Sequence, residues 1–91
     1  MAKKYIVTVL GKDSTGLVAQ VSDFCWKKDL NIEEIKQEII DGNFFMLMSV
    51  DAEQSKSSFK EIQDGLVKMG EKIGLQVVLY DTEIFKTMHR V

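Results

Sequence analysis

The sequence predicts an α+β fold in which four strands and two helices follow one another in the order β-α-β-β-α-β. Four short runs are rich in β-branched and aromatic residues, at 5–10, 30–40, 44–50 and 75–80, and such runs are typical of strands. Two longer segments, 16–28 and 59–73, repeat apolar residues at helical spacing. With right-handed crossovers, this order gives a four-stranded antiparallel sheet with both helices on one face, the ferredoxin-like architecture.

The first strand, residues 5–10, is largely apolar on both faces and is therefore expected to be central in the sheet. It leads into a loop from Gly11 to Gly16, whose two glycines permit a sharp turn. Ser14 or Thr15 is expected to cap the helix that follows. The free N–H groups and positive dipole end of that helix suit a small anion. A plain strand-to-helix turn without a ligand is the alternative interpretation.

The second strand, residues 30–40, carries a break in its pattern. Its apolar alternation slips between Ile32 and Ile35, which indicates a β-bulge or an edge position. Its four charged residues also suit an edge strand. The stretch Asp41-Gly42-Asn43 is a strong hairpin signal, so the strand at 44–50 is expected to pair with it directly.

The second helix, residues 59–73, has signals at both ends. Three serines ahead of it can cap its first turn, namely Ser55, Ser57 and Ser58. Gly74 follows the last apolar residue, where a C-cap glycine belongs. Two glycines inside the helix, Gly65 and Gly70, are expected to permit close packing on the sheet.

Two helices on one face leave the other sheet face bare, yet the strands at 5–10 and 44–50 are apolar on both faces. A bare apolar face of this size is usually an interaction surface, so the chain is expected to form a homodimer. In the C-terminal tail, 81–91, Thr82 can cap a short helix with three apolar residues on one side, Ile84, Phe85 and Met88. We expect this tail to cover part of the bare face, its own or a partner's.

Length and composition indicate an ordinary globular chain. Ninety-one residues suit a single domain, 1–91, and a net charge of −2 gives no general attraction to nucleic acid or to an anionic membrane. No apolar run is long enough to cross a membrane, and no signal peptide is expected. A single cysteine excludes an internal disulfide and fits a cytoplasmic location.

The side chains that catalytic or metal-binding versions of this architecture need are missing. An acylphosphatase-like enzyme needs an arginine in the first loop, and the only arginine is Arg90. A soft-metal site needs paired cysteines, but the only one, Cys25, lies on the apolar stripe of the first helix. Ser14 has no histidine in a plausible layout, since the only one is His89. An RNA-binding sheet needs basic residues beside its aromatics, which 44–50 lacks. We expect no enzyme activity, metal or cofactor; turnover of acyl phosphates would reveal the phosphate-handling alternative.

The first loop does suit a small zwitterion. Helix amides near Gly16 and Leu17 can bind an α-carboxylate. Asp13 can accept hydrogen bonds from an α-ammonium group, or it can simply cap the loop. Asn31, at the start of the second strand, offers both a donor and an acceptor. The sequence leaves open whether Asn31 and Asp13 meet, within one chain or across a dimer.

Three segments together resemble an ACT domain: residues 7–22, which read VTVLGKDSTGLVAQVS, the later Leu30-Asn31-Ile32, and the ending at 84–90. The chain is similar to the small single-domain ACT proteins of the UPF0237 type and to the glycine cleavage system regulatory protein, over nearly its whole length. Two positions depart from the family pattern. Thr15 stands where many members have proline, and Asp29 stands where many have glycine, although aspartate tolerates the left-handed backbone conformation.

The resemblance implies a regulatory module that binds an amino acid at a homodimer interface, between the first loop of one subunit and the second-strand region of its neighbour. Carried over by position, the implied site consists of Gly11, Asp13, Thr15, Gly16 and Leu17, opposite Asn31 and Ile32. We therefore expect a cytoplasmic homodimer that binds a small amino acid and regulates a partner protein. A ligand-free dimerisation or protein–protein interaction module is the alternative.

Overall fold

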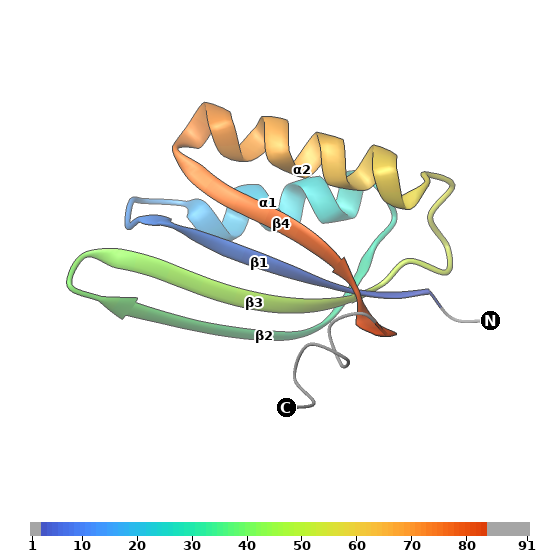
Figure 1. Ribbon diagram of the computed structural model, residues 1–91, viewed down its shortest axis with the longest axis horizontal. Coiled ribbons are helices and arrows are strands. Elements are labelled where there is room, and N and C mark those ends of the chain that lie inside the picture. The colour runs from blue at the N-terminus through green and yellow to red at the C-terminus, as the bar shows by residue number, and fades with distance from the viewer. Residues whose placement is uncertain (1–2, 84–91) are drawn as a thin grey trace.

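The computed structural model describes residues 3–83 and confirms the predicted order of elements. The strands are β1 (Lys4–Lys12), β2 (Asn31–Ile40), β3 (Asn43–Asp51) and β4 (Leu75–Asp81), and the helices are α1 (Leu17–Lys27) and α2 (Phe59–Ile73). The strands form one sheet in the order β2-β3-β1-β4, with every neighbouring pair antiparallel. Both helices cover the same face of this sheet (Figure 1). The central place of β1 and the edge place of β2 agree with the sequence predictions.

The hydrophobic core fills the space between the helices and the sheet. Alternate residues of each strand point to opposite faces, and those on the helix side of β1, Tyr5, Val7 and Val9, are all buried. They meet Val21 from α1 and Leu66 from α2, both fully buried in the same cluster. The helical spacing of apolar residues in the sequence therefore marks the faces that the helices bury.

The break in the β2 pattern is a real irregularity of the sheet. Pairing with β3 shifts register between Ile32 and Glu34, so that Ile32 lies opposite Val50 while Glu34 lies opposite Ser49. Glu33 is the extra residue, as expected for a β-bulge. After the bulge, Ile35 and Ile39 return to the helix side of the sheet, opposite Met48 and Phe44 respectively.

Two tight turns depend on aspartates in the left-handed backbone region. Asp41 and Gly42 have φ values of 50° and 78°, which makes the β2–β3 connection a two-residue turn of type I′. Asp29 has a φ of 57° just after α1. Its N–H donates to the carbonyl oxygen of Trp26 at 3.1 Å, and the N–H of Leu30 donates to that of Cys25 at 2.9 Å. This pair of bonds is a Schellman motif, so Asp29 takes the place that glycine commonly fills.

Helix α2 begins with a capping box. Of the three serines that the sequence analysis considered, Ser58 is the N-cap. The Ser58 hydroxyl oxygen accepts a hydrogen bond from the Glu61 N–H at 3.1 Å, and the Glu61 carboxylate accepts one from the Ser58 N–H at 2.9 Å. This backbone bond, together with the side-chain bond between the two residues, lowers the pKa of Glu61. Because the folded pKa is lowered, the contribution of Glu61 to stability is present above the ordinary carboxyl pKa and is lost as the pH falls through the lowered value.

We predict that Ser58→Ala lowers the free energy of unfolding by about 1 kcal/mol, because it removes the acceptor for an otherwise unpaired helix amide. Urea unfolding at neutral pH measures this loss. Ser57→Ala is the matched control, since Ser57 precedes the cap and its hydrogen bond to Ser55 uses the backbone N–H rather than its own hydroxyl. Equal losses in the two variants would contradict the role given to the capping box.

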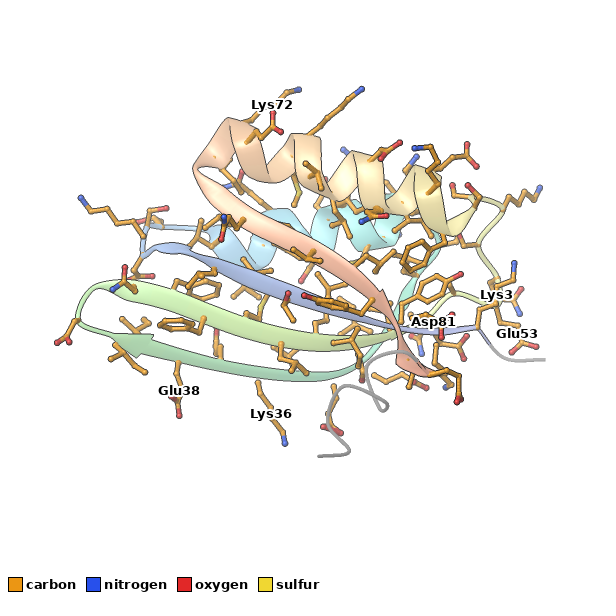
Figure 2. The ribbon with its side chains drawn as sticks, in the orientation of Figure 1. Lys3, Lys36, Glu38, Glu53, Lys72 and Asp81 are labelled. Atoms are coloured by element: carbon orange, nitrogen blue, oxygen red, sulfur yellow. The ribbon has the colours of Figure 1, made fainter. Side chains whose placement is uncertain are left out.

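The sheet face away from the helices is here called the open face. Its apolar and hydroxyl-bearing residues are Ile6, Thr8, Leu10, Ile40, Phe45, Leu47, Ser49, Val78 and Tyr80, with Glu34, Lys36 and Glu38 of β2 along one side. Lys36 and Glu38 extend from β2 away from the helices (Figure 2). Beyond β4, Thr82 and Glu83 are helical. The cap of this turn is Asp81 rather than the expected Thr82, since Asp81 Oδ1 accepts from the Glu83 N–H at 2.9 Å. The predicted apolar side of the tail, at 84–88, lies outside the described residues.

Candidate functional site

The loop between β1 and α1 is shorter than the sequence suggested. Strand β1 continues to Lys12, so Gly11 is a paired strand residue rather than the first residue of the loop. Gly11 lies opposite Phe44 on one side and Leu75 on the other. A Cβ atom on Gly11 would stand 2.5 Å from Leu75 Cδ2 and 2.9 Å from the Gly74 carbonyl oxygen. Glycine at this position is therefore explained by the close approach of the chain entering β4.

The loop proper runs over residues 13–16 and is tied to the neighbouring hairpin. The backbone N–H of Asp13 donates to the carbonyl oxygen of Gly42 at 2.9 Å. Asp13, Ser14 and Thr15 are exposed. This bond fixes the loop beside the β2–β3 turn, with the Asp13 side chain accessible to solvent.

Helix α1 begins without a side-chain cap, so the expectation that Ser14 or Thr15 caps it is wrong. The N-cap residue is Gly16, with φ 79° and ψ 14°, in a region that favours glycine. The first intrahelical bond runs from the Gln20 N–H to the Gly16 carbonyl oxygen at 3.1 Å. The amides between them have no acceptor within the helix, and no acidic residue occupies the first turn. The helix start is thus open to an anion. Leu17 is buried in the core and can offer such a ligand only its backbone.

Asn31 and Ile32 lie at the far end of the same sheet. Asn31 pairs with Asp51, and Asp51 pairs with Lys4, whereas the loop follows Lys12 at the other end of β1. Eight residue steps of strand separate the two ends, about 26 Å. Asn31 is exposed, and Ile32 is half-buried against the core. One chain therefore does not bring the two predicted halves of the site together.

An ionic cluster strengthens the Asn31 end of the sheet. Lys4 Nζ lies 2.7 Å from the Glu33 carboxylate in the bulge and 3.3 Å from that of Asp51. These two partners raise the pKa of Lys4. The pKa of Asp51 is lowered, first by the hydrogen bond from the Glu53 N–H at 2.9 Å and then by Lys4. The cluster joins the bulge of β2 to β1 and β3, and so holds the strand end that carries Asn31.

Strand β2 is exposed along almost its entire length, as an edge strand is, but the exposure of its isoleucines was not expected from the sequence. Ile35, Ile39 and Ile40 are 40%, 60% and 50% exposed, although their pattern had marked them as apolar points of an ordinary strand. A ten-residue edge strand with exposed isoleucines offers unpaired backbone groups together with apolar side chains. The charged residues beside them and the slip between Ile32 and Ile35 were the sequence signals of this edge. Trp26 of α1 is also exposed, and nothing in the sequence had singled it out.

The described part of the chain holds no group of three metal-ligating side chains. Cys25 is fully buried, and burial raises the pKa of its thiol to about 11, so it is protonated at neutral pH and poorly nucleophilic. Within residues 3–83 there is no histidine to activate Ser14, and His89 lies outside that range. No helix in this range is both long and apolar enough to cross a membrane.

Comparison with known proteins gives matches over nearly the whole chain. Residues 3–80 match the ACT domain model. A UPF0237 protein of Methanocaldococcus jannaschii is 40% identical over 88 residues, which cover 97% of this chain and 98% of the relative. The solved structure of an ACT domain protein from Streptococcus pneumoniae aligns with a TM-score of 0.84 and 31% identity, covering 94% of this chain and 97% of the other. A putative glycine cleavage system transcriptional repressor shares the fold, with a TM-score of 0.76 at 19% identity, covering 87% of this chain and 45% of the other.

Proposed function

Because the chain belongs to the ACT domain family, we propose that it is a regulatory module that binds a small amino acid at a homodimer interface. The observation that carries the proposal is the exposed edge of β2, which connects the two halves of the candidate site. The Asn31 end and the Ile40 end of this edge lie at opposite ends of the sheet. Two copies that align their β2 edges antiparallel put the Asn31 end of each beside the Ile40 end of the other.

The loop at 13–16 is close to the Ile40 end because Asp13 is bonded to Gly42 in the turn that follows Ile40. The antiparallel dimer therefore joins the loop of one copy to the Asn31 region of the other, and does so twice. The same contact buries Ile35 and Ile39, which are exposed in the isolated chain, and it pairs backbone groups that the edge leaves open.

An α-amino acid fits the chemistry of these two halves. The open amides after Gly16 bind its carboxylate, favoured by the helix dipole, and the Asp13 carboxylate accepts from its ammonium group. Asn31 of the second copy offers an amide that can both donate and accept, and Ile32 provides an apolar wall. Thr15 is part of the loop. Gly11 in β1 and the buried Leu17 at the start of α1 hold the two sides of the loop in place. This arrangement binds and needs no reacting group, so we assign the chain a regulatory rather than a catalytic role, acting on a partner protein in the cytoplasm.

The test is thermal unfolding of the purified protein with each free amino acid in turn. A ligand at one hundred times its dissociation constant adds about 2.7 kcal/mol if it binds only the folded state. For a chain of this size that is a shift on the order of 10 °C. We predict that Asp13→Ala abolishes the shift while sedimentation still reports a dimer. Ser14→Ala is the matched control and retains the shift, because Ser14 is an exposed neighbour that does not cap α1.

A ligand-free interaction module is the second candidate, favoured by the same exposed isoleucines of β2. It predicts a dimer that no amino acid stabilises. Ile39→Lys places a charge at each end of the proposed contact, where Ile39 of one copy meets the Asn31 end of the other, and is expected to give monomers in sedimentation under either candidate. A monomeric wild-type protein with no ligand response would contradict both.

A further inference from the structure

We propose that the exposed part of the open face is a second interface between copies of this chain, in which two sheets pack face to face across a two-fold axis. This contact is separate from the proposed pairing of β2 edges, which forms the amino acid site. Three features of the described residues lead to it: a shallow hollow on the open face, two opposite charges beside the hollow, and the register that these charges favour.

The hollow lies over three neighbouring strands and has a volume of about 700 Å³. It is centred on the row in which Val9 of β1, Met46 of β3 and Gln37 of β2 lie opposite one another. The side chains of this row point to the helix side of the sheet, so the open face is hollow between the rows on either side. One of these rows holds Leu10 and Phe45, which are 41% and 40% exposed. Exposed apolar side chains around a hollow favour burial against another surface.

Two opposite charges lie beside the hollow on the edge strand. Lys36 and Glu38 of β2 both extend to the side of the sheet away from the helices (Figure 2). Gln37 separates them, so one charge lies on each side of the row on which the hollow is centred. Within the described part of the chain, neither residue forms an ion pair. Both charges are therefore available to a second surface.

A two-fold axis along the central row makes the open face complementary to itself. It exchanges the positions on either side of Gln37, so Lys36 of one copy faces Glu38 of the other, and this pair occurs twice. On β3, Phe45 of one copy faces Leu47 of the other. Packed sheets lie about 10 Å apart, a distance that an extended lysine and an extended glutamate bridge together. A second copy thus covers the hollow and pairs both charges.

The same charges disfavour the neighbouring arrangements. Moving the axis by one residue along β2 places Glu38 against Glu38 or Lys36 against Lys36, and facing like charges are unfavourable. An axis parallel to the strands places β2 over β4 instead, so neither charge gains an opposite partner. On the open face, β4 presents Gln76, Val78 and Tyr80. The axis across the strands, on the row of the hollow, therefore gives the favourable pairing.

The face contact and the edge contact use different surfaces, so one chain can make both. Two edge dimers that stack by their open faces form a closed tetramer. The face contact adds no backbone hydrogen bonds, because every strand stays in its own sheet. We therefore expect it to be weaker than the edge contact and to form at higher protein concentration, while the edge dimer is the largest species in dilute protein.

Exchange of the two charges tests the pairing. Lys36→Glu brings glutamates face to face and Glu38→Lys brings lysines face to face, so each is expected to weaken tetramer formation at least about tenfold, as measured by sedimentation equilibrium over a concentration series. The variant with both changes restores association, because the axis pairs the exchanged charges again. An equimolar mixture of the two single variants restores it as well. Single variants that associate like wild type, or a double variant as weak as the single ones, would overturn the proposal.

Leu10→Lys separates the face contact from the edge contact. Leu10 lies on β1, and β3 lies between β1 and β2, so this lysine meets a stacked sheet but not an edge partner. It is expected to leave edge dimers at every concentration, whereas Val67→Lys, on exposed α2, retains the tetramer. A wild type that stays dimeric at about 1 mM, and that Ile39→Lys makes monomeric, would overturn the face contact alone. A wild-type dimer that Leu10→Lys abolishes and Ile39→Lys does not would instead support the face contact and contradict the edge contact.

Discussion

Leu66→Ala is expected to lower the free energy of unfolding by about 3–4 kcal/mol, within the range of 2–5 kcal/mol typical for a buried leucine. Leu66 is fully buried, on the face of α2 that also buries Ile62 one turn earlier. Truncation removes apolar contact and leaves a cavity, because the sheet below and α1 beside it cannot close around the missing atoms. A small domain has little stability to lose, so this single change is expected to remove a large part of it.

Val67→Ala is the matched control, since Val67 is the next residue of α2 and is 38% exposed. Its replacement is expected to change stability by less than about 1 kcal/mol. Urea unfolding measures both variants, and an unchanged denaturant slope ensures that the losses are comparable. Similar losses at Leu66 and Val67 would mean that α2 does not pack as described.

Local signals allowed most of the fold to be predicted. The periods of two and 3.6 residues in the apolar pattern located the strands and helices. The slip between Ile32 and Ile35 marked the bulge, and Asp41-Gly42 marked the turn, because both residues must adopt positive φ. Each of these features depends on residues that are close in the sequence, which is why one sequence suffices to read them.

The features that the sequence did not reveal depend on partners far along the chain. Gly11 is in β1 because Phe44 and Leu75 pair with it from two sides. The start of α1 has no side-chain cap because the Asp13 N–H is held by Gly42 and Gly16 turns left-handed. The exposure of Ile39 follows from the position of β2 at the edge of the sheet, where only β3 pairs with it. The separation of Asn31 from the loop is likewise a property of the sheet order, and the site itself stays a prediction.

Gly70→Ala is expected to destabilise the protein by about 2 kcal/mol or more, even though alanine is the better helix former by about 1 kcal/mol. A Cβ atom at Gly70 would stand 2.6 Å from the Leu75 carbonyl oxygen and 2.8 Å from Val77 Cγ2. The carbonyl belongs to the backbone of β4 and cannot rotate away, so α2 has to move off the sheet. Overpacking of this kind typically costs 1–3 kcal/mol.

Gly65→Ala in the same helix is the matched comparison. Its Cβ atom would meet only the ring edge of Phe24, at 2.8 Å, and Phe24 is a side chain of α1 at the partly exposed margin of the core. The ring can turn, so the gain in helix propensity is expected to offset the contact and leave stability within about 1 kcal/mol of wild type. The two glycines therefore serve different contacts: Gly65 lets α2 approach α1, and only Gly70 sets the distance from α2 to the sheet. If both variants lost the same amount in urea unfolding, the close approach of α2 to β4 would not be the reason for Gly70.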